Sequence, residues 1–290
     1  MLTVKSKLLL ARMLNRGIRG VRRAGGLPMQ TICRRKGVTW DLDLDEGIDL
    51  SIYLLGAYEG YLLRAYEPLV RPGDCVFDIG ANIGAHTLHF ARLAGPAGVV
   101  HAFEPTDYAF RKLRRNLALN PDLLPRVRAH QVFLSGGDTT ALPAAICSSW
   151  PVDRWTADAV RDNLDEQSLG KSKPLDGASA ITADRFCAEQ GTARLDLIKL
   201  DVDGNESAVL LGFRAALARF RPKILIELAP HLHYPGANLI FDEFVGFLAE
   251  LRYDFFDARS RLAIPPNGPG LRSAISKGTS INGLLLPRPG

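Results

Sequence analysis

The residues of this chain with the clearest capacity to bind a ligand lie in Asp78-Ile-Gly-Ala-Asn-Ile-Gly84, a turn that follows a short apolar segment. Gly80 and Gly84 lack side chains, so the backbone can turn tightly there and approach a bound molecule closely. The N–H groups at the start of a helix after the turn would suit a carboxylate. Asp78 could contact an ammonium group, directly or through water, so the turn fits the charged end of an amino acid.

A second candidate contact is Glu104, which ends the next apolar segment, Val99–Phe103. A carboxylate at this position can accept hydrogen bonds from both hydroxyls of a ribose. Asp78 and Glu104 together therefore fit adenosine nucleotides in general.

The spacing of the glycines narrows this class. A dinucleotide site uses G-x-G-x-x-G so that a pyrophosphate can approach, whereas here Ala81 and Asn82 follow Gly80 and the next glycine is Gly84. The chain has no P-loop pattern either. A nicotinamide-dependent oxidoreductase is therefore disfavoured, and a nucleotide-binding protein without catalysis remains a further alternative.

The elements that must position these residues alternate between strands and helices from about Asp74 onward. Periodicity predicts strands over 75–78, 99–103, 128–134, 195–200, 223–228, 253–256 and 282–286, and helices over 84–94, 107–120, 182–190, 206–217 and 240–251. This order predicts an α/β fold with a doubly wound, mainly parallel sheet and helices on both faces. Ligands bind such sheets at the carboxyl ends of the strands, where Asp78 and Glu104 are expected.

We divide the chain into a basic N-terminal extension over 1–36, a lead-in over 37–73 and a main domain over 74–290. The lead-in is expected to contain a strand over 37–44 and a helix over 51–69. The segment 135–178 is rich in Gly, Pro, Ser, Asp and Lys, and a structureless loop of this length is unusual in a compact domain. We therefore expect an insertion with some local structure, such as a lid.

The net charge of +5 is concentrated at the N-terminus, because residues 1–40 contain ten Lys or Arg residues and no Asp or Glu. Residues 1–23 have the pattern of a basic amphipathic helix, and their apolar run Leu8–Leu10 is too short for a membrane span or a secretory signal. Such a helix could pack on the main domain, rest on an anionic membrane surface, or contact nucleic acid or an acidic carrier protein. The four cysteines form no C-x-x-C pair, which fits a reducing, cytoplasmic location with or without membrane attachment.

Three of these segments resemble the signatures of one enzyme family. Val76–Ala85 looks like motif I of class I methyltransferases in the form typical of the FkbM family, while Leu195–Glu206 and Arg221–Glu227 resemble that family's second and third signatures. The lead-in Gly37–Glu59 is also similar, so the resemblance covers about residues 37–260.

The resemblance implies a seven-stranded Rossmann-like methyltransferase sheet, S-adenosyl-L-methionine as the cofactor and O-methylation as the usual reaction. Two features depart from the family pattern, namely Asp203, where the family usually has Glu, and the long segment after Ser135, so acceptor specificity does not carry over. With Ala81 and Ser135 added to the contacts that the resemblance implies, the expected cofactor-binding residues are Asp78, Gly80, Ala81, Asn82, Gly84, Glu104 and Ser135.

A hydroxyl acceptor must be aligned with the methyl donor and must lose its proton, and a general base typically contributes about 10²–10⁴-fold to such a step. Asp201, at the end of the fourth expected strand, is the first candidate for this base or for an acceptor contact. His231, with the nearby His233, is the second, because histidine titrates near neutral pH. Lys199 is expected to pair with a nearby carboxylate, because an unpaired buried charge is costly.

We expect no metal site, although Asp201, Asp203, Glu227, His231 and His233 could supply oxygen and nitrogen ligands to a magnesium-like ion. The expected partner is a small-molecule or glycan acceptor. A nucleic acid is not expected, because Leu200–Gly204 is acidic and offers no aromatic platform for a base. The sequence gives no prediction of the oligomeric state.

Overall fold

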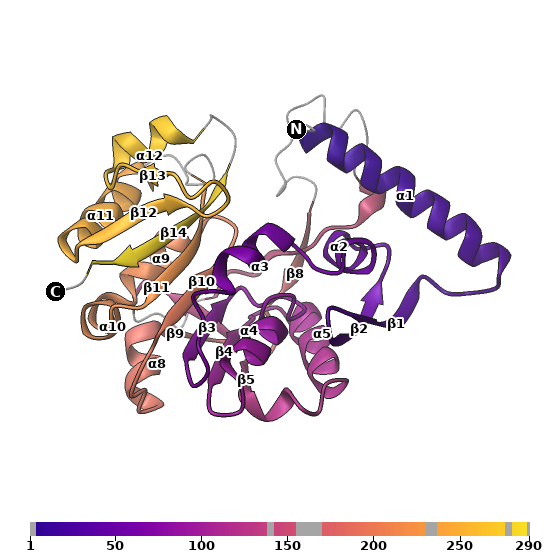
Figure 1. Ribbon diagram of the computed structural model, residues 1–290, viewed down its shortest axis with the longest axis horizontal. Helices are drawn as coiled ribbons and strands as arrows, with labels where there is room; N and C mark the ends of the chain where they lie inside the picture. Colours follow the sequence, from indigo (N-terminus) through magenta and orange to yellow (C-terminus); the bar gives the residue numbers. More distant parts are fainter. Residues whose placement is uncertain (1–3, 138–141, 155–169, 230–236, 276–279, 289–290) are drawn as a thin grey trace.

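The computed structural model describes residues 4–137, 142–154, 170–229, 237–275 and 280–288. At its centre is an eight-stranded sheet with the order β13-β12-β14-β11-β10-β3-β4-β5 (Figure 1). The strands from β11 to β5 are parallel, and β14 is antiparallel to both of its neighbours. The bounds are β3 (Cys75–Ile79), β4 (Val99–Phe103), β5 (Val127–His130), β10 (Leu197–Leu200), β11 (Lys223–Leu228), β12 (Tyr253–Asp257), β13 (Ala263–Ile264) and β14 (Ile281–Pro287). The predicted doubly wound, mainly parallel sheet is confirmed, and the two-residue strand β13 extends it at one edge.

Helices cover both faces of the sheet, as predicted, and divide the apolar core in two. One face carries α2 (Gly47–Leu55), α3 (Gly60–Tyr66), α4 (Thr87–Ala94) and α5 (Asp107–Ala118), and the other carries α8 (Ala183–Glu189), α9 (Glu206–Leu211), α10 (Arg214–Phe220), α11 (Ala237–Glu250) and α12 (Gly268–Ala274). Val76 and Leu197 pack into the first core, whereas Phe77 and Ile198 pack into the second. Because side chains alternate along a strand, Asp78 and Lys199 point to the first face.

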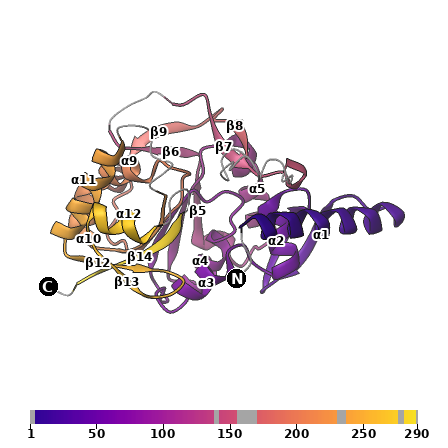
Figure 2. The same ribbon diagram turned by 90° about the horizontal axis from the view of Figure 1, so that it is seen from above.

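The N-terminal residues form a unit at one end of the molecule, opposite the C-terminal strands (Figures 1 and 2). It consists of α1 (Val4–Ala24) and an antiparallel hairpin of β1 (Gln30–Arg35) and β2 (Val38–Asp43). The predicted lead-in strand is β2, but the single helix predicted over 51–69 is wrong. Gly56, with φ +82°, ends α2 in the left-handed region and separates it from α3.

The single strand predicted over 128–134 is also wrong, because the structure has two strands there. Gln131 separates β5 from the next strand, β6 (Val132–Ser135). Strand β6 leaves the main sheet and pairs in parallel with β9 (Ser179–Thr182). The turn η1 (Leu124–Arg126) precedes β5. Between β6 and β9, the described part of 135–178 contains an antiparallel pair, β7 (Ala145–Ser149) and β8 (Lys171–Pro174), and the turn η2 (Val152–Arg154).

This insertion is attached to the lead-in through Glu46. The Ser149 hydroxyl and the Trp150 N–H donate to the two carboxylate oxygens of Glu46 at 2.9 and 2.8 Å. The N–H of Gly47 donates in return to the carbonyl of Trp150 at 2.9 Å. The insertion therefore contacts the segment that precedes the main domain.

The helix predicted over 206–217 divides into α9 and α10 at Gly212. A Cβ atom at Gly212 would lie only 2.3 Å from the carbonyl oxygen of Ser135, so only glycine allows β6 to approach this bend. The packing of β6 against α9 therefore explains a break that helical periodicity does not show.

The ends of β3 and β10 meet at a second glycine, Gly80. Its backbone is left-handed (φ +75°), and a Cβ atom would lie 1.8 Å from the carbonyl oxygen of Asp201. Any side chain here would force the turn after β3 away from the loop after β10, because backbone rather than a flexible side chain blocks it.

We expect Gly80→Ala to lower the free energy of unfolding by at least about 2 kcal/mol, because the added methyl is both overpacked and in a strained backbone region. Gly246→Ala is the matched control, since Gly246 lies in α11 with no atom within 4 Å of the added Cβ. It should be neutral or stabilising by up to about 1 kcal/mol. Urea unfolding measures both, and equal stability of the two variants would contradict the close contact at Gly80.

Candidate active site

The predicted ligand-binding turn after β3 is held by hydrogen bonds within the protein. The N–H groups of Gly80 and Ala81 both donate to the carbonyl oxygen of Phe103 in β4, at 3.1 and 3.0 Å. Asn82 has a left-handed backbone (φ +48°), which asparagine tolerates because its side chain can bond locally, and its Oδ1 accepts from the Ile83 N–H at 2.9 Å. These hydrogen bonds within the protein hold the turn in one shape.

Gly84 closes this turn through a hydrogen bond from its N–H to the carbonyl of Ala81 at 2.8 Å. Helix α4 consequently begins at Thr87, three residues later than predicted. The Thr87 hydroxyl donates to Oδ2 of Asp78 at 2.5 Å, so the first residue of the helix fixes the orientation of this carboxylate.

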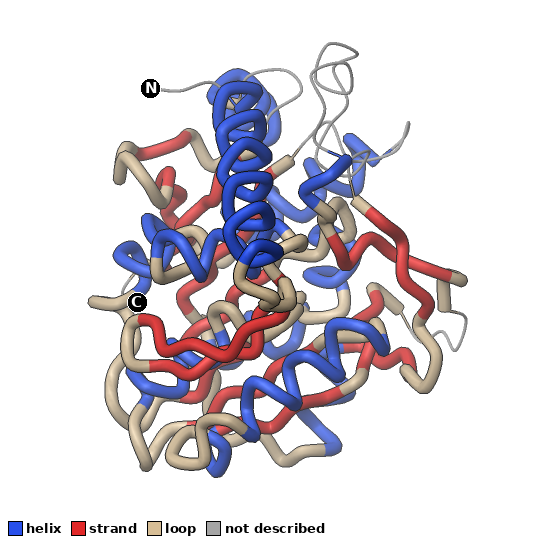
Figure 3. The backbone as a smooth tube through the Cα atoms, turned by 90° about the vertical axis from the view of Figure 1, so that its right-hand side faces the viewer, coloured by secondary structure: helices blue, strands red, loops and turns tan. Residues whose placement is uncertain are grey.

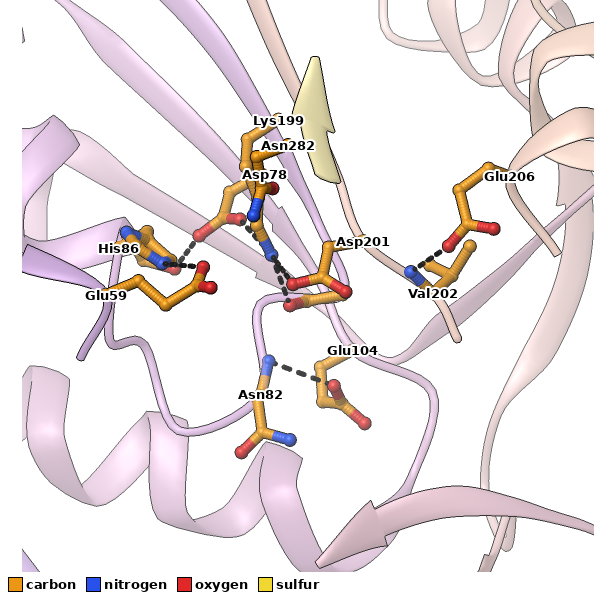
Figure 4. Close-up of polar contacts among 12 residues, drawn as sticks. Glu59, Asp78, Asn82, His86, Glu104, Lys199, Asp201, Val202, Glu206 and Asn282 are labelled. Atoms are coloured by element: carbon orange, nitrogen blue, oxygen red, sulfur yellow. Dashed lines mark hydrogen bonds and ion pairs between the residues drawn. The ribbon is translucent and has the colours of Figure 1, made fainter. Parts of the chain in front are cut away.

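Lys199 carries the buried positive charge at the centre of the site (Figure 4). It is the register partner of Asp78 across β10 and β3, and its ammonium lies 3.8 Å from Oδ1 of Asp78 and 3.2 Å from Oδ2 of Asp201. It also donates to the carbonyl of Gly80 at 3.2 Å. Burial alone would lower the pKa of Lys199, but the carboxylates of Asp201 and Asp78 outweigh it and raise the pKa above its ordinary value. Lys199 thus forms the expected ion pair with two carboxylates, those of Asp78 and Asp201.

Asp78 has one carboxylate oxygen without a hydrogen-bond partner among the residues that the structure describes. Its side chain is buried, Oδ2 is bound to Thr87, and Oδ1 has no hydrogen-bond partner within the described parts of the chain. Burial raises the pKa of Asp78, and Lys199 and Thr87 counteract only part of that shift. An ammonium group beside Oδ1 would satisfy this oxygen and stabilise the charged form, which fits the amino-acid end of the predicted ligand.

Glu104, the predicted ribose contact, directly follows the last residue of β4. Its Oε2 accepts from the Asn82 N–H at 3.0 Å, and its Oε1 accepts from the N–H and the hydroxyl of Thr106 at 2.9 and 2.6 Å. Burial raises the pKa of Glu104, which these hydrogen bonds partly offset. A carboxylate offers about four acceptor positions, so roughly one remains for a ribose hydroxyl while the turn keeps this arrangement.

The insertion reaches the same carboxylate indirectly, because the hydroxyls of Thr106 and Ser148 lie 2.7 Å apart. Ser135, the last predicted cofactor contact, ends β6 and is buried, and its hydroxyl donates to the carbonyl of Gly137 at 2.9 Å. Its role toward the cofactor stays a prediction.

The loop after β10 carries the predicted acceptor-side carboxylates. The side chain of Asp201 is 26% exposed, so a bound molecule could reach it. Carboxylate oxygens of Asp201, Asp203 and Glu227 lie within 4.8 Å of one another, a group that could hold a divalent cation. Burial raises the pKa of Glu227, and the neighbouring acidic groups, first among them Asp201, raise it further. His231 and His233 lie outside the described residues.

Glu206 has a structural function in this loop. Its carboxylate accepts from the N–H groups of Val202 at 2.8 Å and Gly204 at 3.0 Å, and its side chain is buried (Figure 4). Burial raises the pKa of Glu206 to about 7. These bonds fix the backbone that follows Asp201, in which Asp203 adopts a left-handed conformation (φ +53°).

The sequence did not single out a group of polar residues on the same face of the sheet. The hydroxyl of Tyr61 donates to Oε1 of Glu59 at 3.0 Å and accepts from Nδ2 of Asn282 at 2.6 Å. Oε2 of Glu59 lies 3.9 Å from Nε2 of the buried His86. Asn282 is also the register partner of Glu227. Glu59, Tyr61 and Asn282 come from segments that are distant in the chain, and among these three only Glu59 lies in a segment that resembles the family.

Comparison with known proteins identifies one family over most of the main domain. The family model described as "Methyltransferase FkbM domain" matches residues 78–255. The chain is 34% identical over 174 residues to "31-O-demethyl-FK506 methyltransferase FkbM" of Streptomyces tacrolimicus, a match that covers 54% of this chain and 65% of that protein. It is 32% identical over 202 residues to "Methyltransferase sdnD" of Sordaria araneosa, covering 60% of this chain and 77% of that one.

A third relative is "2-O-methyltransferase NoeI" of Sinorhizobium fredii, 27% identical over 157 residues, with 53% of this chain and 63% of that protein covered. The chain thus spans slightly less than two thirds of the first and third relatives. Among solved structures, the FkbM methyltransferase of Methylobacillus flagellatus is 14% identical, with a TM-score of 0.42 and coverage of 93% of this chain and 70% of that one.

We expect Glu104→Ala to weaken the binding of S-adenosylhomocysteine by about 100-fold, because hydrogen bonds to a charged acceptor contribute about 1.5–3 kcal/mol each. Glu104→Gln keeps one acceptor oxygen and should lose less. Glu189→Ala, at an exposed glutamate of α8, is the control for a lost negative charge. Isothermal titration calorimetry measures the affinity, and a folded Glu104→Ala protein that binds as tightly as the wild type would disprove the ribose contact.

Proposed function

The chain belongs to the methyltransferase FkbM family and is an S-adenosylmethionine-dependent methyltransferase, and we propose that it methylates a hydroxyl oxygen of a sugar, a glycan or a small natural product. When bound, the cofactor supplies an electrophilic methyl group on a sulfonium. The observation that carries the proposal is the half-buried carboxylate of Asp201 beside the turn after β3. The Lys199 ammonium lies 3.2 Å from Oδ2 of this carboxylate and holds it there. Family membership sets aside a nicotinamide-dependent oxidoreductase.

In this proposal the cofactor lies along the carboxyl ends of β3 and β4. Oδ1 of Asp78 would accept from the amino group of the methionine part, since this buried oxygen needs a donor. Glu104 would accept from the ribose. Gly80, Ala81, Asn82 and Gly84 would border the cofactor through the shape of the turn, and Ser135 is the remaining proposed contact.

Asp201 would bind the acceptor hydroxyl and take its proton. The charge of Lys199 keeps the carboxylate in one orientation, and the backbone N–H of Asp201 donates to the carbonyl of Ile79 at 3.2 Å. Because the loop is fixed at both the side chain and the backbone, the acceptor oxygen would be held in line with the methyl group. His231 stays a second proposed catalytic residue.

The polar groups around Asp201 support a hydroxyl-bearing acceptor. Glu59, Tyr61, Asn282 and Glu227 lie on the same side of the sheet and offer donors and acceptors at short range. An acceptor with several hydroxyls could exchange hydrogen bonds with this network, whereas an apolar one would desolvate it and offer no hydrogen bonds in return. The acidic loop would repel a phosphate backbone, which disfavours nucleic acid.

Two relatives support transfer to oxygen through their names, "31-O-demethyl-FK506 methyltransferase" and "2-O-methyltransferase". The first name indicates a small natural product. We also propose that the reaction takes place in the cytoplasm, because all four cysteines are free thiols.

The proposal predicts that the protein transfers isotopically labelled methyl from S-adenosylmethionine to a hydroxyl of a molecule present in extracts of its own cells. Mass spectrometry and nuclear magnetic resonance of the labelled product should show a methyl ether. A labelled N-methyl or C-methyl product would disprove O-methylation.

With that product in hand, Asp201→Asn should lower kcat by about 10²–10⁴-fold while changing the cofactor Kd by less than about tenfold. The control is Asp254→Asn, at an exposed carboxylate that is paired with Arg288 at the far edge of the sheet. If Asp201→Asn turned over as fast as the wild type, Asp201 would have no role in the mechanism. The family assignment would be unaffected by that result.

A further inference from the structure

Helix α1 is attached to the rest of the protein through one of its faces. Asn15 is 4% exposed, and its side chain donates to the carbonyl of Leu44 at 2.6 Å and to Oδ1 of Asp45 at 3.1 Å. Arg19, one turn further along, binds the same Asp45 oxygen at 2.5 Å. The helix also touches α2 and the insertion turn η2. The predicted contact with the main body of the protein is thus present, but it uses only part of the helix surface.

The opposite face of α1 is apolar and exposed. Met13 is 70% exposed and Val21 is 75% exposed, and Leu10 and Leu14 are each more than 40% exposed. Successive residues of an α-helix are rotated by about 100°, which places these four side chains on the side away from Asn15. Figure 3 shows α1 in front of the rest of the backbone, at the outside of the molecule, and the exposed fractions place its apolar side chains in solvent.

Such exposure is not general in this protein. Eight of the ten large apolar side chains that are exposed in the described part of the chain lie between residues 10 and 55. A row of apolar side chains on one long helix is therefore a local feature that requires its own explanation.

Cationic side chains accompany this row. Arg16 and Arg23 are exposed on α1, and the first forty residues contain ten Lys or Arg residues but no acidic one. The rest of the chain has a net negative charge, so the net positive charge comes from the first forty residues, which include the exposed apolar face of α1.

We propose that the exposed face of α1 binds the surface of an anionic lipid bilayer, with the helix lying in the plane of the interface. Met13, Val21 and their neighbours would enter the acyl boundary, and the arginines would pair with lipid phosphates. In the described residues no helix is long and apolar enough to span a bilayer. Nucleic acid would use the charges but not the apolar row. An acidic protein could use both, but its binding would not require an anionic lipid, so vesicle binding distinguishes the two.

The test is sedimentation of the full-length protein with vesicles of phosphatidylcholine mixed with phosphatidylglycerol, and with vesicles of phosphatidylcholine alone. We expect clear preference for the mixed vesicles. Met13→Glu should lower the partition coefficient at least about tenfold, because the burial of one methionine side chain is lost. Arg16→Gln should lower it about fivefold, through one lost charge near an anionic surface. The matched control is Leu262→Glu, because Leu262 is also 70% exposed but lies far from α1 in the sequence; it should bind like the wild type.

Circular dichroism establishes that each variant is folded. Failure of the wild type to bind the mixed vesicles, or equal binding by Met13→Glu, would overturn the proposal. It would also be overturned if the wild type formed a dimer without lipid and Met13→Glu were monomeric, because a second copy would then cover this face. None of these outcomes depends on the acceptor, so the proposed function is tested separately.

Discussion

The arrangement of this active site depends on one buried cation. The Lys199 ammonium lies between a carboxylate on β3 and a carboxylate after β10, and it also binds the carbonyl of Gly80. A buried charge is tolerated only when it is well paired, so this lysine requires Asp78 and Asp201 to stay close to it. Through Lys199, the side of the site that is proposed to bind the cofactor is connected to the side that is proposed to bind the acceptor.

The neighbouring backbone strengthens this connection. The turn after β3 touches the loop after β10 directly at Gly80, and Glu206 holds that loop through the N–H groups of Val202 and Gly204. Methyl transfer requires mainly that donor and acceptor be aligned, because the leaving group is a neutral thioether. A site whose two halves are held together by these contacts is suited to that requirement, and the exposed part of Asp201 is where an acceptor oxygen would be aligned.

The sequence predicted those parts that local pattern determines. The glycine spacing around Gly80, the place of Glu104 and the alternation of strands and helices all follow from residues that are near one another in the chain. It did not predict that β6 leaves the sheet, because this depends on the contact between Ser135 and Gly212. Tyr61 and Asn282 escaped notice for the same physical reason, since only the completed sheet brings β14 beside α3. The amphipathic helix of residues 1–23 was predicted, but the side on which it packs became evident only when Asn15 was placed against Leu44.

The most direct test of the role of Lys199 is a double-mutant cycle between Lys199→Met and Asp201→Asn, measured as free energies of unfolding in urea. If the lysine connects the two halves, the effects of the single substitutions will not add, and the coupling energy will be at least about 1 kcal/mol. Additive effects, within about 0.5 kcal/mol, would show that Lys199 and Asp201 act independently and would contradict this account.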